Sequence, residues 1–271
     1  MTNAPRDRGS LWSARDRVDL PCRVNEREWD AVADTFEEDI FNVPANDRLG
    51  LIAERVKRFG NKKGSAADIG CGIGRTLPML AHAFGSVRAS DISGECLAIA
   101  ERKCNAWPNI SYHHLDLREV NGSNEAVDFA LCINVLLTAS LAMRQHMFKS
   151  VLAQIKPGGH LLLTCPALES ALYASHRLVQ WNIDKGMPPA VAQQKASRDA
   201  SRLDMGIVQL DGVATKHYLR EELEDVLRAN DLLPVETLKL EYPWSSVFPE
   251  SPAGMAEPLP WNWMVLAQRL G

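Results

Sequence analysis

The segment Ala67-Asp68-Ile69-Gly70-Cys71-Gly72-Ile73-Gly74-Arg75 places an acid and three glycines where an apolar strand is followed by a helix. Residues 65–69 are predicted to form a short buried strand, and the apolar positions within 77–84 indicate the helix. Glycine permits a positive φ and, because it lacks a Cβ, lets a ligand lie against the backbone at the N-terminal end of a helix. The sequence therefore predicts a ligand-binding turn between this strand and this helix.

The spacing of this turn separates two classes of ligand. The dinucleotide fingerprint needs a small residue at its third position, and that position is Arg75 here. Asp68, two residues before the first glycine, would repel a pyrophosphate but suits an ammonium group, directly or through water. The pattern D-x-G-x-G-x-G resembles motif I of the class I S-adenosylmethionine (SAM) dependent methyltransferases, and the resemblance implies that Asp68 serves the methionine moiety.

Asp91 stands at the end of a second predicted strand, 86–90, and lies 21 residues after Gly70. Both hydroxyls of a ribose can donate to one such carboxylate, so we expect Asp91 to bind the ribose. The alternative is that Asp91 caps the helix that begins near Gly94, although Ser93 is better suited to that purpose.

Two further strand ends carry polar residues. A strand at 110–115 ends in Asp116-Leu117, where the family that the chain resembles uses an acid for the adenine amino group and the next backbone amide for the ring nitrogen. Without the family, Asp116 is only a turn acid. Asn134 follows the strand at 127–133, and the resemblance places it beside the methionyl end of SAM, where its amide would bond the ammonium or the carboxylate. The alternative is that Asn134 satisfies its own turn.

The resemblance thus assigns cofactor contacts to a set of residues around the turn and the strand ends. They are Asp68, Gly70, Cys71, Gly72, Gly74, Asp91, Ile92, Asp116, Leu117, Asn134 and Trp29.

Helices and strands alternate along the chain. A helix at 142–155 precedes Lys156-Pro157-Gly158-Gly159 and an apolar strand at 160–164, which is typical of the same family. A helix at 221–230 and strands at 233–242 and 263–268 complete the pattern, which indicates a doubly wound α/β sheet. By resemblance the sheet is mostly parallel and seven-stranded, with the order 3-2-1-4-5-7-6 and the last strand antiparallel, and the ligand lies beyond the strand carboxyl ends.

The N-terminal region is expected to be a mobile leader over 1–28, followed by a single domain over 29–271. Apolar residues at 29, 32, 33 and 36 predict one helix over 28–36 that closes over the cofactor, although packing alone also explains Trp29 and Phe36. A second amphipathic helix is predicted over 47–59.

The segment 166–216 is too long for a simple connection between a strand and a helix. Helices are predicted over 168–184 and 190–203, on either side of Pro188-Pro189. We interpret the segment as a helical lid over the substrate. The alternative is a dimerisation element, which would make the protein a homodimer.

Catalysis is expected to rest on positioning, because the methyl group of SAM is already activated. Candidates for a general base near the predicted lid are His176, His217, Tyr173 and Tyr218, each with a packed or surface role as its alternative. Trp181, Trp244 and Trp261 form either an aromatic wall against a planar or cationic substrate or part of the core.

Composition limits the other possibilities. The net charge of −4 over 271 residues provides no overall basic field, which counts against nucleic acid as a partner. Six cysteines without a C-x-x-C pair indicate neither a metal site nor a redox dithiol, and favour a reducing cytoplasm. No apolar run approaches the ~20 residues of a membrane span.

The sequence as a whole predicts a cytoplasmic methyltransferase that moves a methyl group from SAM to the O, N, C or S atom of a small molecule and releases S-adenosylhomocysteine (SAH). The alternatives are a methyltransferase that acts on RNA or protein, and a SAM-binding scaffold without turnover. The strand end Asn134-Val135-Leu136-Leu137 lacks the N-P-P-Y type sequence of many amino-directed enzymes that modify nucleic acids or proteins.

Overall fold

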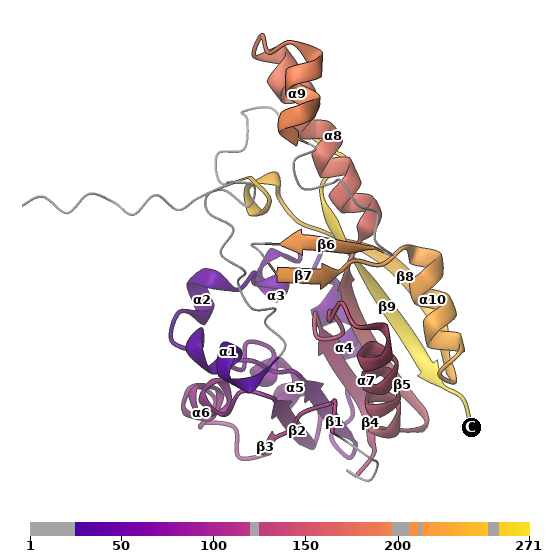
Figure 1. Ribbon diagram of the computed structural model, residues 1–271. Helices are drawn as coiled ribbons and strands as arrows, with labels where there is room; N and C mark the ends of the chain where they lie inside the picture. Colours follow the sequence, from indigo (N-terminus) through magenta and orange to yellow (C-terminus); the bar gives the residue numbers. More distant parts are fainter. Residues whose placement is uncertain (1–24, 120–124, 197–205, 211–212, 249–254) are drawn as a thin grey trace, which may run out of the picture.

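The computed structural model describes residues 25–119, 125–196, 206–210, 213–248 and 255–271, arranged around a seven-stranded sheet. The strands lie in the order β3-β2-β1-β4-β5-β9-β8 (Figure 1). They are β1 Ser65–Ile69, β2 Ser86–Asp91, β3 Ile110–His114, β4 Val127–Ile133, β5 Ile155–Pro166, β8 Leu232–Glu241 and β9 Trp261–Arg269. Neighbours among β1 to β5 pair in parallel, whereas β9 is antiparallel to both β5 and β8. The predicted strand order and the antiparallel last strand are therefore confirmed.

Helices cover both faces of the sheet, as its nearly continuous apolar strands require. One face packs against α4 Leu51–Phe59, α5 Leu77–Ala83 and α6 Gly94–Lys103, and the other against α7 Leu141–Ala153 and α10 Arg220–Arg228. Side chains along β4 alternate between the two cores, so that Phe129 and Leu131 join the first and Ala130 and Cys132 the second. The faces are thus closed, and ligands are left with the edge formed by the strand carboxyl ends.

The N-terminal segment folds differently from the single helix predicted over 28–36. It forms α1 Glu26–Ala31, α2 Phe36–Asp39 and α3 Val43–Asn46. Asn25 and Glu28 make a capping box that starts α1 at Glu26, inside the segment 1–28 predicted as a leader, whose residues 1–24 lie outside the described residues. Thr35 donates to Val32 O at 3.5 Å and to Asp39 Oδ2 at 2.6 Å, local bonds that compete with a continuous helix. The predicted single helix is therefore wrong.

The predicted lid segment contains both helices and strands. Helix α8 Leu168–Asp184 and helix α9 Pro189–Ala196 extend away from the sheet (Figure 1), and residues 197–203 of the second predicted helix lie outside the described residues. A hairpin of β6 Ile207–Leu210 and β7 Val213–Lys216 follows, which the sequence did not predict.

The hairpin leads into the carboxyl ends of β4 and β5. Lys216 N donates to Leu137 O at 2.8 Å, just after β4, and Tyr218 N donates to Pro166 O at 2.9 Å, at the end of β5. Backbone hydrogen bonds therefore fix this part of the segment at the edge of the sheet where a ligand is expected.

Within the described part of the chain, no helix has the length and apolar character needed to cross a membrane. The same residues contain no group of three or more His, Cys, Asp and Glu side chains placed to hold a metal ion.

Candidate functional site

The glycine turn after β1 has a backbone that other residues adopt with difficulty. Gly70, Gly72 and Gly74 have φ values of +73°, +52° and +86°. A Cβ at Gly70 would collide with Val135 Cγ2, and a Cβ at Gly72 would lie 2.7 Å from Phe36 Cζ. The turn is bound to the end of β2, because Gly70 N and Cys71 N donate to Ser90 O at 2.8 and 3.0 Å. Bare backbone is thus held at the switch point of the sheet, as the sequence predicts.

Asp91 lies directly beside this turn. Its Oδ2 accepts a 2.7 Å hydrogen bond from Gly72 N, and its Oδ1 accepts a 2.9 Å bond from Ser93 N. The N-cap of α6 is Ser93, whose Oγ accepts from Cys96 N at 3.0 Å, so Asp91 does not cap the helix. Burial raises the pKa of Asp91, against the opposing effect of the backbone N–H groups of Ser93, Gly72 and Ile92. The carboxylate retains lone pairs that can accept from two hydroxyls.

Asp68 lies behind the turn and is only 2% exposed. Its Oδ2 accepts a short hydrogen bond from Thr76 Oγ1. Burial raises the pKa of Asp68 to about 7; the Thr76 bond opposes this rise and the charge of Asp91 adds to it. A nearby cation would favour the ionised form, which is the behaviour expected of an acid that serves an ammonium group.

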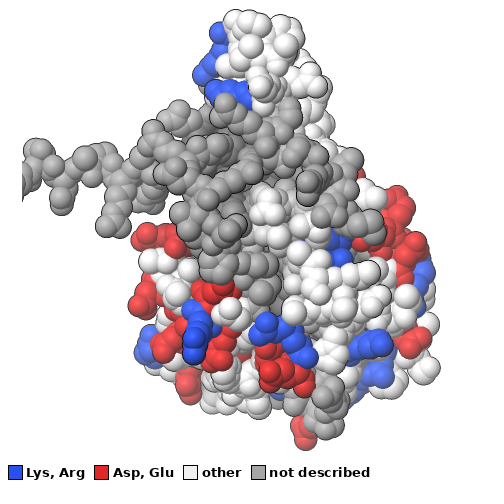
Figure 2. Space-filling view, viewed as in Figure 1, with Lys and Arg blue, Asp and Glu red and all other residues white. Residues whose placement is uncertain are grey.

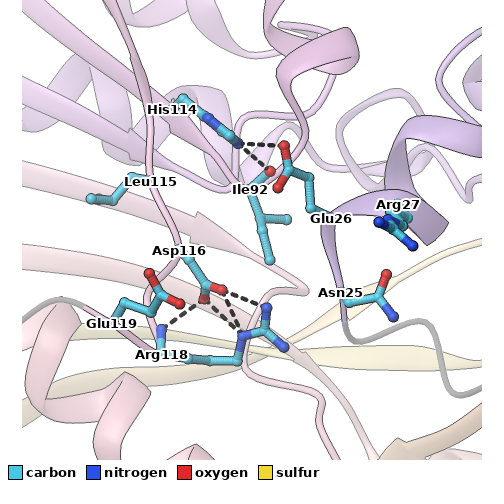
Figure 3. Close-up of a pocket in the computed structure, with 9 residues that line it drawn as sticks. All are labelled: Asn25, Glu26, Arg27, Ile92, His114, Leu115, Asp116, Arg118 and Glu119. Atoms are coloured by element: carbon cyan, nitrogen blue, oxygen red, sulfur yellow. Dashed lines mark hydrogen bonds and ion pairs between the residues drawn. The ribbon is translucent and has the colours of Figure 1, made fainter.

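A cavity of about 550 Å³ opens where β2 and β3 end (Figure 3). Its size lies in the range of roughly 300–1,000 Å³ that is usual for small-molecule sites. The residues that line it are Asn25, Glu26, Arg27, Ile92, His114, Leu115, Asp116, Arg118 and Glu119. Ile92 and Asp116 were expected at the site from the sequence, whereas the other seven were not.

Asp116 is held by Arg118 on the wall of this cavity (Figure 3). Arg118 Nε lies 2.8 Å from both carboxylate oxygens, Nη2 makes a further short contact, and the backbone N donates at 2.9 Å. Burial works to raise the pKa of Asp116, but the bonds and charge of Arg118 outweigh it and hold this pKa below its usual value. The carboxylate is therefore ionised and fixed in orientation.

Helix α1 forms another wall of the cavity because it is attached to the start of α6. Asp30 Oδ1 accepts from Ser93 Oγ at 2.6 Å and from Glu95 N at 3.3 Å. On the same side His114 Nε2 lies 2.7 Å from Ile92 O and 3.2 Å from Glu26 Oε1. The capping box at Asn25 was the one signal in the sequence that could have placed the start of this helix.

Trp29 of α1 and Phe36 of α2 are not among the residues that line the cavity. Their ring centroids are 6.5 Å apart, and Phe36 contacts the backbone at Gly72. Arg75 donates to Phe36 O and Ile40 O, both at 3.0 Å, and its guanidinium lies 4.9 Å from the centre of the Phe36 ring. The residue that departs from the dinucleotide fingerprint therefore attaches the N-terminal segment to the glycine turn.

The remaining predicted cofactor residues lie in or near the same edge of the sheet. Cys71 is a buried thiol, and burial raises its pKa. Leu117 is buried, and its carbonyl accepts from Ser150 Oγ at 2.8 Å. Asn134 has a left-handed backbone with φ +54°, and its Oδ1 lies 3.3 Å from Thr164 Oγ1.

The four candidate bases differ in their surroundings. Tyr218 is 1% exposed and its hydroxyl donates to Leu136 O, contacts that support a structural role. His217 is buried, its Nδ1 lies 3.2 Å from Thr215 O, and burial lowers its pKa to about 4. The Tyr173 hydroxyl accepts from Arg177 Nη1 at 3.0 Å, and His176 is exposed.

The three tryptophans do not form one wall among the described residues. Trp244 and Trp261 are buried and lie 6.0 and 6.3 Å from the Tyr173 ring centre, whereas Trp181 contacts Lys185 Nζ, 4.1 Å from its ring centre. Trp244 and Trp261 are thus part of the core.

Comparisons with known proteins match the chain to methyltransferases. A family model described as "Methyltransferase domain" matches residues 66–159. The dTDP-3-amino-3,6-dideoxy-alpha-D-glucopyranose N,N-dimethyltransferase of Streptomyces fradiae is 38% identical over 68 residues, which is 25% of this chain and 26% of that protein. The chain thus matches about a quarter of the length of this curated relative.

Solved structures resemble the chain over most of its length. The 1,6-didemethyltoxoflavin-N1-methyltransferase of Burkholderia thailandensis, with its substrate and SAH bound, has a TM-score of 0.57, 16% identity and 94% coverage of each chain. A magnesium protoporphyrin IX methyltransferase of Synechocystis with bound SAH has a TM-score of 0.56 and 18% identity, over 90% of this chain and 95% of that one. A SAM-dependent methyltransferase of Methanosarcina mazei has a TM-score of 0.55 and 16% identity, over 80% and 97%. At these identities the likeness shows the fold.

Proposed function

We propose that the chain is a class I SAM-dependent methyltransferase that transfers the methyl group of SAM to a small-molecule acceptor and releases SAH. The observation that carries this proposal is the contact between Asp91 and the glycine turn. It brings a carboxylate suited to a ribose against bare backbone, beside a cavity whose wall holds Asp116.

The residues around the turn fit the three parts of SAM. Asp116 would accept from the adenine amino group and Asp91 from the ribose hydroxyls. The backbone at Gly70 and Gly72 would support the methionyl part, with Asp68 behind it. SAM supplies an activated methyl group, so the protein has to hold the acceptor in line with it and exclude water. Positioning of this kind needs no strong base, which agrees with the low pKa of His217 and the engaged hydroxyl of Tyr218.

A small acceptor is supported by charge and by the relatives. On the face of the molecule shown in Figure 2, the described basic and acidic side chains are interspersed rather than gathered in a basic strip suited to nucleic acid. The relatives named above include proteins whose names specify a dTDP-linked amino sugar, 1,6-didemethyltoxoflavin and magnesium protoporphyrin IX. We propose that α8, α9 and the β6–β7 hairpin cover the acceptor, since the hairpin leads into the carboxyl ends of β4 and β5.

The direct test is to incubate the protein with SAM and fractionated metabolite extracts and to search by mass spectrometry for products heavier by one methylene unit. We expect such a product, formed together with SAH, and its loss in Asp91→Ala. Fragmentation of the product identifies the methylated atom. Transfer of the methyl group to RNA or protein instead would contradict a small-molecule acceptor, and SAM binding without turnover on any fraction would indicate a scaffold.

The competing interpretation of 166–216 as a dimerisation element has its own measurement. Light scattering coupled to size-exclusion chromatography should give the mass of one chain if the segment is a lid. A dimer that dissociates when Val191, 48% exposed on α9, is replaced by Glu would favour the dimerisation element.

A further inference from the structure

A chain of polar side chains runs through the interior from the start of α8 to the end of β4. Trp261 N donates to Ser170 Oγ at 2.8 Å, and Ser170 makes a side-chain hydrogen bond with Tyr242. The Tyr242 hydroxyl donates to Asn262 Oδ1 at 3.3 Å, and Asn262 Nδ2 donates to Asn134 Oδ1 at 3.3 Å. Ser170 and Asn262 are only 4% and 3% exposed, so water does not substitute for these partners.

The direction of each bond is assigned from its own partners. A backbone N–H can only donate, so Ser170 Oγ accepts from Trp261. The bond from Ser170 opposes the rise that burial causes in the Tyr242 pKa, which is the effect of a Ser170 hydroxyl that donates to the Tyr242 oxygen. The Tyr242 hydroxyl then donates to an oxygen of Asn262, which leaves the Asn262 nitrogen facing Asn134. The two ends of an amide side chain look alike in shape, and here the hydrogen bonds distinguish them.

Asn134 is the end of the chain, and its amide orientation is thereby fixed. Its Oδ1 accepts from Asn262 Nδ2 and also from Thr164 Oγ1, each at 3.3 Å. The Nδ2 group points the other way. Among the described residues no atom accepts a hydrogen bond from Asn134 Nδ2. This nitrogen is also not one of the buried side-chain nitrogens that lack a hydrogen-bond partner. The neighbouring Val135 packs against Gly70, so this amide lies beside the glycine turn.

The left-handed backbone of Asn134 gives independent support. A φ of +54° is unfavourable for a residue with a Cβ, although asparagine tolerates it better than most. Such conformations persist where surrounding contacts over-determine them, and they cluster at functional sites.

We propose that Ser170, Tyr242 and Asn262 are positioning residues that present the Asn134 amide NH₂ as a hydrogen-bond donor to the methionyl carboxylate of SAM. The inference rests on the proposed function and extends it. An NH₂ group has no acceptor capacity for an ammonium, so the chain of bonds selects the carboxylate from the two partners that the sequence left open. Because Ser170 lies in the first turn of α8, it also connects the predicted lid to the cofactor.

The test compares two ligands by isothermal titration: SAH, and its analogue that keeps the amine but lacks the carboxylate. Asn134→Ala should weaken SAH binding by roughly tenfold or more, the usual effect of losing a hydrogen bond to a charged group, and leave the analogue unchanged. Tyr242→Phe and Ser170→Ala, which reach the proposed cofactor through Asn134, should weaken SAH binding by roughly twofold to tenfold with the same selectivity.

Tyr112→Phe is the matched control, because the Tyr112 hydroxyl is buried without a hydrogen-bond partner and stands outside the chain. It should change neither affinity. Equal weakening of both ligands by Tyr242→Phe and Ser170→Ala, or no weakening of either, would overturn the positioning role. Failure of the unaltered protein to bind SAH would contradict the proposed function itself, whereas normal SAH binding without the selective loss would overturn this inference alone.

Discussion

The backbone N–H of Gly72 donates a 2.7 Å hydrogen bond to Oδ2 of Asp91, although 19 positions separate the two residues. One residue belongs to the turn after β1 and the other to the end of β2. Their contact joins the proposed methionyl and ribose parts of the site without a ligand. A preformed site of this kind loses less conformational entropy when the cofactor binds.

Replacement of Asp91 by Ala should weaken SAH binding by about 1–3 kcal/mol, because charge-assisted hydrogen bonds to the ribose are lost. Isothermal titration measures the change. Asp225→Ala is the control, since the Asp225 side chain is 81% exposed on α10. Unchanged affinity in Asp91→Ala would remove this residue from the ribose site.

The raised pKa of Asp68 should make the unliganded protein less stable as the pH rises. Burial raises this pKa to about 7, so the native state holds a proton that the unfolded chain releases near its usual value of 3.8. The resulting stability is complete below the unfolded pKa and is lost as the pH rises through about 7. Urea unfolding of the unaltered protein and of Asp68→Asn between these pH values measures the difference. If both proteins respond equally to pH, Asp68 ionises normally.

Gly72→Ala should destabilise the protein through two separable effects. A positive φ costs a residue with a Cβ roughly 1–2 kcal/mol, and the new Cβ would also meet the Phe36 ring. Urea unfolding of Gly72→Ala in the presence and absence of Phe36→Ala separates them. In the Phe36→Ala background, the loss of unfolding free energy caused by Gly72→Ala should fall to the part that comes from the positive φ alone. An identical cost in both backgrounds would show that Phe36 does not pack on the turn.

Arg118→Ala should reduce selectivity for adenine, because Arg118 keeps Asp116 ionised and oriented. The comparison uses SAH and S-inosylhomocysteine, which lacks the amino group that would donate to Asp116. The unaltered protein should prefer SAH by roughly tenfold or more, in proportion to a hydrogen bond with a charged acceptor, and the variant should lose most of this preference. Retained preference in Arg118→Ala would mean that Asp116 acts without Arg118.

The alternation of apolar strands and helices in the sequence indicated a doubly wound sheet. The strand order and the ligand edge could be predicted because the glycine turn, Asp91 and Asn134 resemble the motifs of a known family. Asp91 is hydrogen-bonded to the glycine turn and Asp68 is buried behind it, and the roles of both residues toward a cofactor stay predictions.

The features of the fold and the site that the sequence did not predict depend on contacts between residues far apart in the chain. Helix α1 reaches the cavity through Asp30 and Ser93, 63 positions apart, and Asn134 and Asn262 are separated by 128. No local pattern reports such pairs. The turn at Thr35 was missed for a different reason. The apolar residues at 29, 32, 33 and 36 have the spacing of one helix, but a side-chain hydrogen bond of Thr35 competes with the continuous helix.

A crystal structure of the protein with SAH tests most directly whether the glycine turn and the three acids Asp68, Asp91 and Asp116 form a SAM site. We predict the ribose hydroxyls on Asp91, the adenine in the cavity beside Asp116 and Ile92, and the homocysteine along Gly70 and Gly72. Electron density for SAH at any other place, or none at a saturating concentration, would contradict the account.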